Sequence, residues 1–169
     1  MKFTAQEEYG LRCLLQIARQ GEGGSLTIPE ISGAEGISIP YVAKLVRILR
    51  QGSFVKSTRG QTGGYVLARP PEQIVIGEVL GLLGGRLFES EYCERFPGVV
   101  EICTHTVDCA IRSLWHAVQL GVDQILSHAT LRDLLSNEQE MSSSMNGLVK
   151  LEGLSARPPL YSLSRSAGD

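Results

Sequence analysis

Apolar residues in the N-terminal third of the chain recur at the spacing of amphipathic helices. Residues 4–20 show this pattern first, and residues 38–51 show it again. The apolar positions are Leu11, Leu14, Leu15 and Ala18 in the first segment, and Val42, Leu45, Val46 and Leu49 in the second. We therefore predict a helix in each segment, with one apolar face directed into a core.

A short helix between these two is indicated by its capping residues. Thr27 and Glu30 have the spacing of a capping box, in which each side chain accepts a hydrogen bond from the other residue's backbone. We expect this helix to end near Gly33. Ser38 is the expected N-cap of the next helix, and Gly52 is expected to close it. Three helices joined by short turns predict a helix-turn-helix unit.

A hairpin is predicted after the third helix. Residues 54–58 (FVKST) and 65–68 (YVLA) are prone to form strands, and RGQTGG joins them, with Arg59 at the base of the turn. This is the form of a wing, so the predicted fold is mostly α with a small β wing. In such a winged helix-turn-helix domain the third helix enters the major groove of DNA, and the wing arginine can reach the minor groove.

A second amphipathic stripe follows in the C-terminal half of the chain. Its apolar positions are Ile111, Leu114, Trp115, Val118, Val122 and Ile125. The stripe predicts one long helix, which a domain of this size covers only in part. Packing against the same helix of a second copy would bury the stripe and would separate two recognition helices by a fixed distance, which suits a two-fold operator. The alternative is packing within one chain.

The remaining segments complete the predicted organisation. Thr130 and Asp133 form a second capping box, which indicates a short helix. The segment after Gln139 is rich in serine and offers little to a core, so we expect it to be mostly disordered, with a short ordered piece at GLVKLEGL. The predicted parts are a DNA-binding domain (1–86), a cysteine-rich loop (87–107), a dimerisation helix with a short following helix (108–138) and a tail (139–169).

Composition narrows the class of protein. The chain of 169 residues is 43% hydrophobic and 20% charged, as in globular proteins, and its apolar runs are too short to cross a membrane. The N-terminus reaches acidic residues early and lacks the apolar stretch of a secretory signal. These features predict a cytoplasmic protein.

Charge is distributed unevenly although the net charge is only −2. Residues 36–71 contain no Asp or Glu. The cations in this segment are Lys44, Arg47, Arg50, Lys56, Arg59 and Arg69. A basic island in a mildly acidic chain fits a polyanionic partner such as DNA, and the alternative is a solvated face without a partner.

Three of the four cysteines lie close together. Cys93, Cys103 and Cys109 are separated by nine and five residues, and His105 lies between the second and the third. Structural disulfides are rare in a reducing compartment, and zinc sites usually contain two-residue spacings. Thiolates are the preferred ligands of iron-sulfur clusters, so a cluster is a candidate, while zinc and thiol chemistry remain open. Thr106 is the expected N-cap of the long helix, which would place Cys109 in its first turn.

The stretch GISIPYVAKLVRILRQGSFVKSTRGQTGGYVLARP, followed by the spaced cysteines and CAIRSLW, resembles the winged-helix transcription regulators that bind iron-sulfur clusters, the IscR/NsrR-like family. The resemblance extends over about residues 1–135. It implies a homodimeric repressor or dual regulator that binds double-stranded DNA. It also implies a [2Fe–2S] or [4Fe–4S] cluster that alters DNA affinity in response to iron, redox state or nitric oxide.

The resemblance also implies roles for individual residues. Cys93, Cys103 and Cys109 would hold the cluster, and Glu8 of the partner subunit stands where some members supply the fourth ligand. Arg112 stands where the cluster-assembly regulator has a ligating histidine, and arginine cannot take that role. The residues that would face DNA are Ser38, Pro40, Tyr41, Ala43, Lys44, Arg59 and Gly60. The cluster-assembly regulator has a glutamate at the position of Ala43, so its switch between operator classes is not expected here.

Two other classes of protein are alternatives to this interpretation. The first is a winged-helix regulator without a cluster, which would use the cysteines as a thiol switch or to bind zinc. The second is an enzyme, such as a thiol oxidoreductase using a cysteine with His105 or His116. The chain has no nucleotide-binding loop, nucleophile elbow or two-residue cysteine motif, so we do not expect an enzyme.

Overall fold

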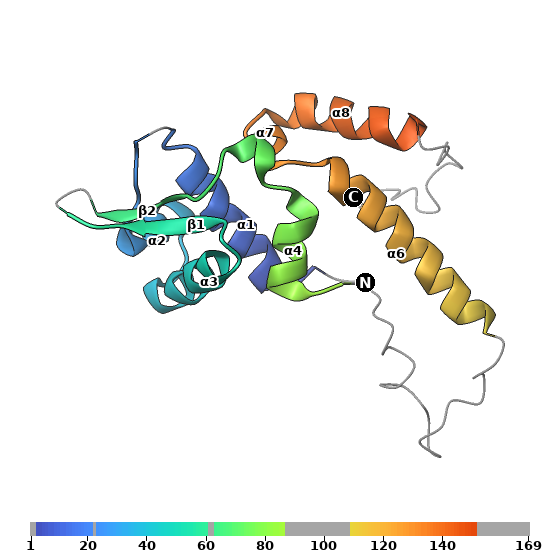
Figure 1. Cartoon of the computed structure of the whole chain (residues 1–169), viewed down its shortest axis with the longest axis horizontal. Coiled ribbons are helices and arrows are strands. Elements are labelled where there is room, and N and C mark those ends of the chain that lie inside the picture. The colour runs from blue at the N-terminus through green and yellow to red at the C-terminus, as the bar shows by residue number, and fades with distance from the viewer. Residues whose placement is uncertain (1–2, 22, 61–62, 87–108, 152–169) are drawn as a thin grey trace, which may run out of the picture. The chain divides into compact units, whose positions relative to one another are not determined.

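The computed structural model describes residues 3–21, 23–60, 63–86 and 109–151. Residues Met1–Ser136 belong to one compact unit and Asn137–Asp169 to a second. The elements are α1 (Ala5–Ala18), α2 (Ile28–Glu35), α3 (Ile39–Gln51), β1 (Val55–Thr58), β2 (Gly64–Leu67), the 3-10 helix η1 (Pro71–Gln73), α4 (Ile76–Gly84), α6 (Ala110–His128), α7 (Leu131–Leu134) and α8 (Glu138–Leu151) (Figure 1). The predicted fold class, mostly α with a small β wing, is confirmed.

The helix starts follow from capping residues in the sequence. Thr27 and Glu30 form the predicted capping box at the start of α2. That helix continues past Gly33 to Glu35, because the left-handed residue that ends it is Gly36, with φ of 65°. The predicted end near Gly33 is therefore wrong. Ser38 is the N-cap of α3 as expected, although its side chain makes no capping hydrogen bond.

Helices α1, α3 and α4 pack together and form most of the core. The predicted apolar stripe of α3 is buried throughout, since Val42, Leu45, Val46 and Leu49 are all 0% exposed. In α1, Leu14 is fully buried, whereas Leu11 and Leu15 lie at the edge of the core and are half-buried. Gly10 permits the close contact of α1 with α4, because a Cβ atom there would lie 2.5 Å from a methyl group of Leu83.

The wing is a two-stranded antiparallel hairpin beside α3 (Figure 1). Its register pairs Val55 with Leu67 and Thr58 with Gly64. Leu26 forms an isolated bridge with Tyr65, which joins the hairpin to the segment before α2. The hairpin is therefore attached to the segment before α2 close to its loop, which begins after Thr58.

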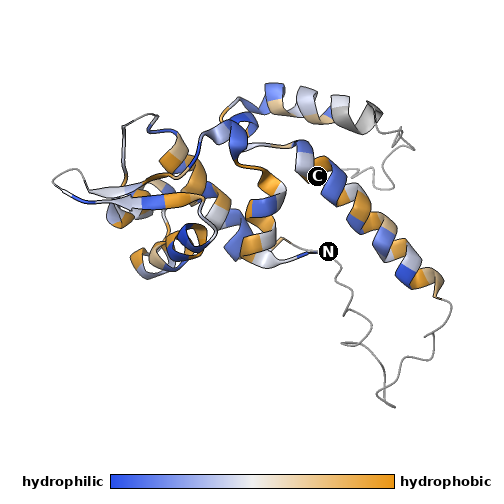
Figure 2. Ribbon diagram, viewed as in Figure 1, coloured by the Kyte–Doolittle hydropathy of each residue, from blue (hydrophilic) through white to orange (hydrophobic). Residues whose placement is uncertain are grey.

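Helix α6 follows the segment that carries the cysteines, and its C-terminal half packs against α4. The Cα of Gly77 in α4 approaches Leu126 closely, and the backbone N–H of Ile76 donates to the carbonyl of Ala129 at 2.8 Å. Figure 2 shows that α6 carries hydrophobic residues between hydrophilic ones along its length. Ile111 and Leu114 are 61% and 57% exposed, so part of the predicted stripe has no cover within this chain's described residues.

The start of α6 differs from the expectation. Its N-cap is Cys109 and its first residue is Ala110, so Thr106 is not the N-cap and Cys109 does not lie in the first turn. The short helix α7 has the predicted capping box of Thr130 and Asp133. The segment 87–108, including the predicted loop 87–107, lies outside the described residues, and its boundaries stay a prediction.

The second unit contains α8, which occupies part of the tail that we expected to be mostly disordered. Residues 140–146, which we expected to be disordered, are helical, and the expected ordered piece at GLVKLEGL begins inside the same helix. Asn137 accepts a hydrogen bond from the backbone N–H of Glu140 at 2.9 Å and so caps the helix. The carboxylates of Glu138 and Glu140 in its first turn interact favourably with the positive end of the helix dipole. Residues 152–169 lie outside the described part of the chain.

None of the helices in the described ranges combines the length and apolar character needed to cross a bilayer.

Candidate nucleic-acid interface and cysteine site

The first two turns of α3 form the centre of the candidate DNA-binding surface. Because the apolar stripe of α3 is buried, the residues between its members are turned outward. Ser38, Pro40 and Lys44 are exposed, and Tyr41 and Ala43 are half-buried. The structure thus places all five predicted residues of this helix together, at its start and on its accessible side.

The basic island is largely exposed around this helix. Lys44, Arg47 and Arg50 are exposed on α3, and Lys56 and Arg59 are exposed on the hairpin. Arg69 is the exception. Its guanidinium lies 2.6 Å from Glu78 and 5.1 Å from the centre of the Phe54 ring. Arg69 therefore serves the packing of the domain, whereas the other five cations can meet phosphate groups.

The wing presents Arg59 and Gly60 directly after β1. Both are exposed, and Gly60 has φ of 111°, a conformation that favours glycine. Thr58 closes the hairpin below them, because its hydroxyl accepts a hydrogen bond from the backbone N–H of Gly64 at 3.2 Å. Arg59 is therefore held at the base of a short loop and its side chain is accessible, as the sequence predicted.

An ion pair between α1 and α2 supports the start of α3. Arg12 donates from Nε to the Glu35 carboxylate at 2.5 Å and from its terminal nitrogen to the Glu35 carbonyl at 3.0 Å. Gln16 also donates to this carboxylate, at 2.5 Å. The hydrogen bond with Glu35 raises the pKa of Arg12 above its ordinary value. Glu35 ends α2 and precedes the turn into α3, so this cluster holds that turn against α1.

Cys109 is the one cysteine of the predicted cluster site that lies in the described part of the chain. It is half-buried at the N-terminus of α6, and its sulfur accepts a hydrogen bond from the backbone N–H of Arg112 at 3.4 Å. The sulfur atom of Cys109 therefore lies at the N-terminus of a helix and is accessible in part, as a metal-ligating cysteine must be. Cys93, Cys103 and His105 lie outside the described residues. Within the described ranges, no three metal-binding side chains lie close enough to hold an ion.

The two acidic residues in the first turn of α1 have different environments. Glu7 is 6% exposed, and its carboxylate accepts a hydrogen bond from the backbone N–H of Thr4 at 2.6 Å, which completes a capping box. Glu8 is exposed, and none of the residues that the structure describes donates a hydrogen bond to its carboxylate. Glu8 is therefore accessible to a ligand from outside its own helix, whereas Glu7 has a structural role.

Cys13 has the environment of a core residue. It is 0% exposed inside α1, and burial raises the pKa of its thiol to about 11. The thiol therefore stays protonated at neutral pH, which suits neither ligation nor redox reaction. This agrees with the interpretation of Cys13 as a small apolar residue.

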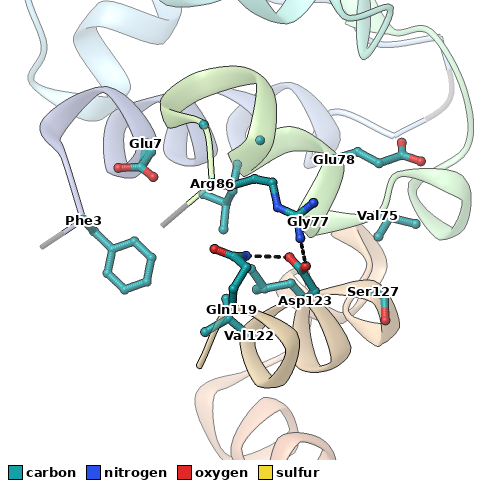
Figure 3. A pocket seen from close by; sticks show the side chains of 14 residues that line it. Phe3, Glu7, Val75, Gly77, Glu78, Arg86, Gln119, Val122, Asp123 and Ser127 are labelled. Atoms are coloured by element: carbon teal, nitrogen blue, oxygen red, sulfur yellow. Dashed lines mark hydrogen bonds and ion pairs between the residues drawn. The ribbon is translucent and has the colours of Figure 1, made fainter. Parts of the chain in front are cut away.

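A cavity of about 580 Å³ lies between the starts of α1 and α4 and the C-terminal half of α6 (Figure 3). Arg86, at the end of the described segment before the cysteines, forms an ion pair with Asp123 of α6. Asp123 also accepts a hydrogen bond from the amide of Gln119 at 2.7 Å. The segment that carries the cysteines thus connects the end of α4 to the start of α6, and the Arg86–Asp123 ion pair joins the same two parts of the chain.

The helix-turn-helix with its wing, the exposed basic face and the accessible start of α3 define a DNA-binding winged-helix transcription regulator. Residues 3–137 match the Rrf2 family, which is described as an iron-dependent transcriptional regulator. The chain belongs to the Rrf2 family.

Relatives and solved structures agree with this assignment. The chain is 32% identical to the HTH-type transcriptional regulator IscR of Sodalis glossinidius over 82% of its own length and 81% of the relative's. It resembles the structure of IscR from T. potens with a TM-score of 0.63 and 28% identity, over 80% of this chain and 86% of that one. It also resembles CymR, the global cysteine regulator of B. subtilis, with a TM-score of 0.60 and 28% identity, over 80% of this chain and 96% of that one. These proteins are regulators, and this chain is a transcription regulator and not an enzyme.

Proposed function

We propose that this regulator is a homodimeric repressor whose affinity for a two-fold DNA operator is controlled by an iron-sulfur cluster on Cys93, Cys103 and Cys109. The observation that carries the proposal is the position of Cys109. Its sulfur lies at a helix N-terminus, receives a backbone hydrogen bond and is partly accessible. A cysteine in this position fits the ligation of a cluster, in a family described as iron-dependent.

The fourth ligand in this proposal is Glu8 of the partner subunit. Three cysteines leave one position open, and Arg112 cannot fill it. The exposed carboxylate of Glu8 is accessible, and the neighbouring Glu7 is engaged with the backbone of Thr4. Ligation by Glu8 would connect the cluster of one protomer to the DNA-binding unit of the other.

The proposed dimer interface is the exposed apolar side of α6. Ile111 and Leu114, which lie three positions apart on one face of α6, are each more than half exposed in the single chain. Burying large apolar side chains against a second copy is favourable by about 25 cal/mol for each Å² removed from water. An isologous contact along α6 would place two copies of α3 on one face of DNA, as a two-fold operator requires.

Control by the cluster requires a structural connection between the cysteines and the two recognition helices. The cysteine segment joins the end of α4 to the start of α6, and the Arg86–Asp123 ion pair connects the same two parts. When bound, the cluster would hold this segment and the partner's first helix in one arrangement. Its loss would release them and change the separation of the two recognition helices. Because the ligand is DNA, we propose a cytoplasmic location.

In the proposed DNA complex the start of α3 enters the major groove and the wing meets the minor groove. Ser38, Pro40, Tyr41, Ala43 and Lys44 belong to the first contact, and Arg59 and Gly60 to the second. Ala43 can contact a thymine methyl group but cannot accept a hydrogen bond from a base. We therefore expect one class of operator rather than two.

Replacing Lys44 with alanine is expected to weaken DNA binding on many sequences. Lys44 is exposed, and in the proposed complex its ammonium group meets a phosphate. Losing one phosphate contact lowers the slope of log affinity against log salt concentration by about one unit. The measurement is DNA affinity at several salt concentrations. Arg132→Ala, which removes an equal charge from α7, is the control. A slope equal to that of the parent would show that Lys44 contacts no phosphate.

The runner-up function is the same regulator with a thiol switch or zinc in place of the cluster. Two observations favour keeping it. The sulfur of Cys109 is partly accessible, so an oxidant can reach it. The chain also resembles CymR, a global cysteine regulator, as well as IscR. Zinc and free thiols are colourless, so the two candidates are easily separated.

Anaerobically purified full-length protein is expected to be brown and to contain stoichiometric iron and sulfide. Cys103→Ala should lose the visible absorption, because two cysteines and a carboxylate do not retain a cluster. Cys13→Ala is the matched control and should keep the full absorption, since Cys13 is buried in the core. If the parent protein stays colourless even after reconstitution with iron and sulfide, the cluster proposal fails and the runner-up stands.

A further inference from the structure

A column of four side chains runs from the turn before α3 to the exposed side of that helix. The Arg12 guanidinium lies 5.4 Å from the centre of the Tyr9 ring. The rings of Tyr9 and Tyr41 meet edge to face, with centres 6.1 Å apart and planes at 90°. The Lys44 ammonium group lies 5.7 Å from the centre of the Tyr41 ring. The column thus consists of two aromatic rings with a cation at each end.

One end of the column is rigidly attached and the other is free to meet a ligand. Arg12 is held by two hydrogen bonds to Glu35, whose side chain is only 9% exposed. Lys44 is exposed and has no ion pair with any residue that the structure describes. The contact between α1 and α2 therefore fixes Arg12, and the side chains stacked on Arg12 extend from it to the start of α3.

The ring of Tyr41 lies beside a hollow at the start of α3. It is half-buried and borders a hollow of about 330 Å³ together with Tyr9, Arg12 and Ser38. Its ring forms an edge-to-face pair with Tyr9 and a cation–π contact with Lys44. An edge-to-face pair has a preferred geometry, so the Tyr9 ring restricts the rotation of Tyr41 toward the hollow.

We propose that Tyr9 is a positioning residue for DNA recognition, which fixes the ring of Tyr41, and through it the ammonium group of Lys44, before DNA is bound. Tyr9 lies on α1, outside the recognition helix. A side chain that is already ordered loses less conformational entropy on binding, so preorganisation increases affinity. The inference rests on the proposed function, because it requires that Tyr41 and Lys44 face DNA.

A purely structural role for Tyr9 would have a different signature. Tyr9 is half-buried and does not belong to the fully buried core. A structural residue would lower thermal stability when replaced, and its effect on DNA affinity would not depend on the residue at position 41. A positioning residue acts through Tyr41, so its effect must vanish when Tyr41 is absent.

The test is a double-mutant cycle with full-length protein. The probe is the duplex of about 30 base pairs that the parent protein enriches from a randomised pool, long enough for two half-sites. Tyr9→Leu and, as a second variant, Tyr9→Gln are expected to weaken binding about twofold to tenfold, with thermal unfolding close to that of the parent. Tyr9→Phe keeps the ring and should bind like the parent. In a Tyr41→Ala background, Tyr9→Leu should have no further effect.

Each other outcome counts against a specific statement. If Tyr41→Ala binds like the parent, or if the parent enriches no duplex, the proposed recognition surface is wrong and the inference falls with it. If Tyr41→Ala weakens binding while both Tyr9 variants bind like the parent, the inference alone is overturned. It is also overturned if Tyr9→Leu weakens binding equally with and without Tyr41.

Discussion

Replacing Leu45 with alanine is expected to lower the free energy of unfolding by about 2–5 kcal/mol. Leu45 is 0% exposed in the middle of α3, which packs against α1, α2 and α4. The substitution removes apolar contacts and leaves a cavity that closely packed helices cannot fill. Because domains are stable by only about 5–15 kcal/mol, this is a large fraction of the total.

The measurement is denaturant unfolding of the full-length protein at one protein concentration, since dimerisation would make apparent stability depend on concentration. Leu45→Met conserves volume and serves as the control, with an expected cost below about 1.5 kcal/mol. DNA affinity of the folded fraction should change little, because Leu45 faces the core. An alanine variant within about 0.5 kcal/mol of the parent would show that α3 is not anchored in the core as the structure indicates.

Local signals in the sequence predicted much of this fold correctly. The stripe of α3 is fully buried, and the capping boxes at Thr27 and Thr130 begin α2 and α7 as expected. These features depend on residues a few positions apart, so a single sequence contains them. The sheet register likewise follows from the glycine-rich turn between two short strands.

Features that depend on tertiary contacts were missed. Helix α4 was not located from the sequence, although Ile76, Val79, Leu80 and Leu83 have helical spacing and are buried against its neighbours, because its three glycines weaken the local signal for a helix. The end of α2 depends on whether Gly33 or Gly36 adopts a positive φ, which the sequence leaves open. Cys109 was assigned to a first turn, although a cysteine can itself occupy the N-cap position.

The candidate site divides in the same way. The presence of a recognition helix and a wing could be derived from periodicity and turn chemistry, and the clustering of three cysteines marked a candidate site. The resemblance added Glu8 and the individual residues that would face DNA. The contacts of Arg12 with Glu35 and of Tyr9 with Tyr41 could not be derived, because each joins residues far apart in sequence. A hint was available, since Tyr9 and Arg12 lie on one face of α1, three positions apart, and share no apolar stripe.

Replacing Arg59 with alanine is expected to reduce operator affinity by about 1–3 kcal/mol, which is about fivefold to 150-fold. Arg59 is exposed at the base of the wing loop and has no ion pair or hydrogen bond with the residues that the structure describes. An arginine in this position can enter a narrow minor groove, where the negative potential is enhanced. Narrow grooves belong to A·T-rich sequences, so the loss should depend on the sequence beneath the wing.

This dependence separates groove recognition from simple charge. The experiment compares parent and Arg59→Ala on two duplexes that differ only in having A·T-rich or G·C-rich steps where the wing lies. Lys56→Ala removes the same charge from an exposed position of β1 and is the matched control. We expect Arg59→Ala to abolish most of the preference for the A·T-rich duplex, and Lys56→Ala to weaken binding to both duplexes alike. If Arg59→Ala weakens binding to both duplexes equally, Arg59 contacts phosphate and the wing does not read the minor groove. If the variant binds both duplexes like the parent, the wing makes no contact with DNA through Arg59.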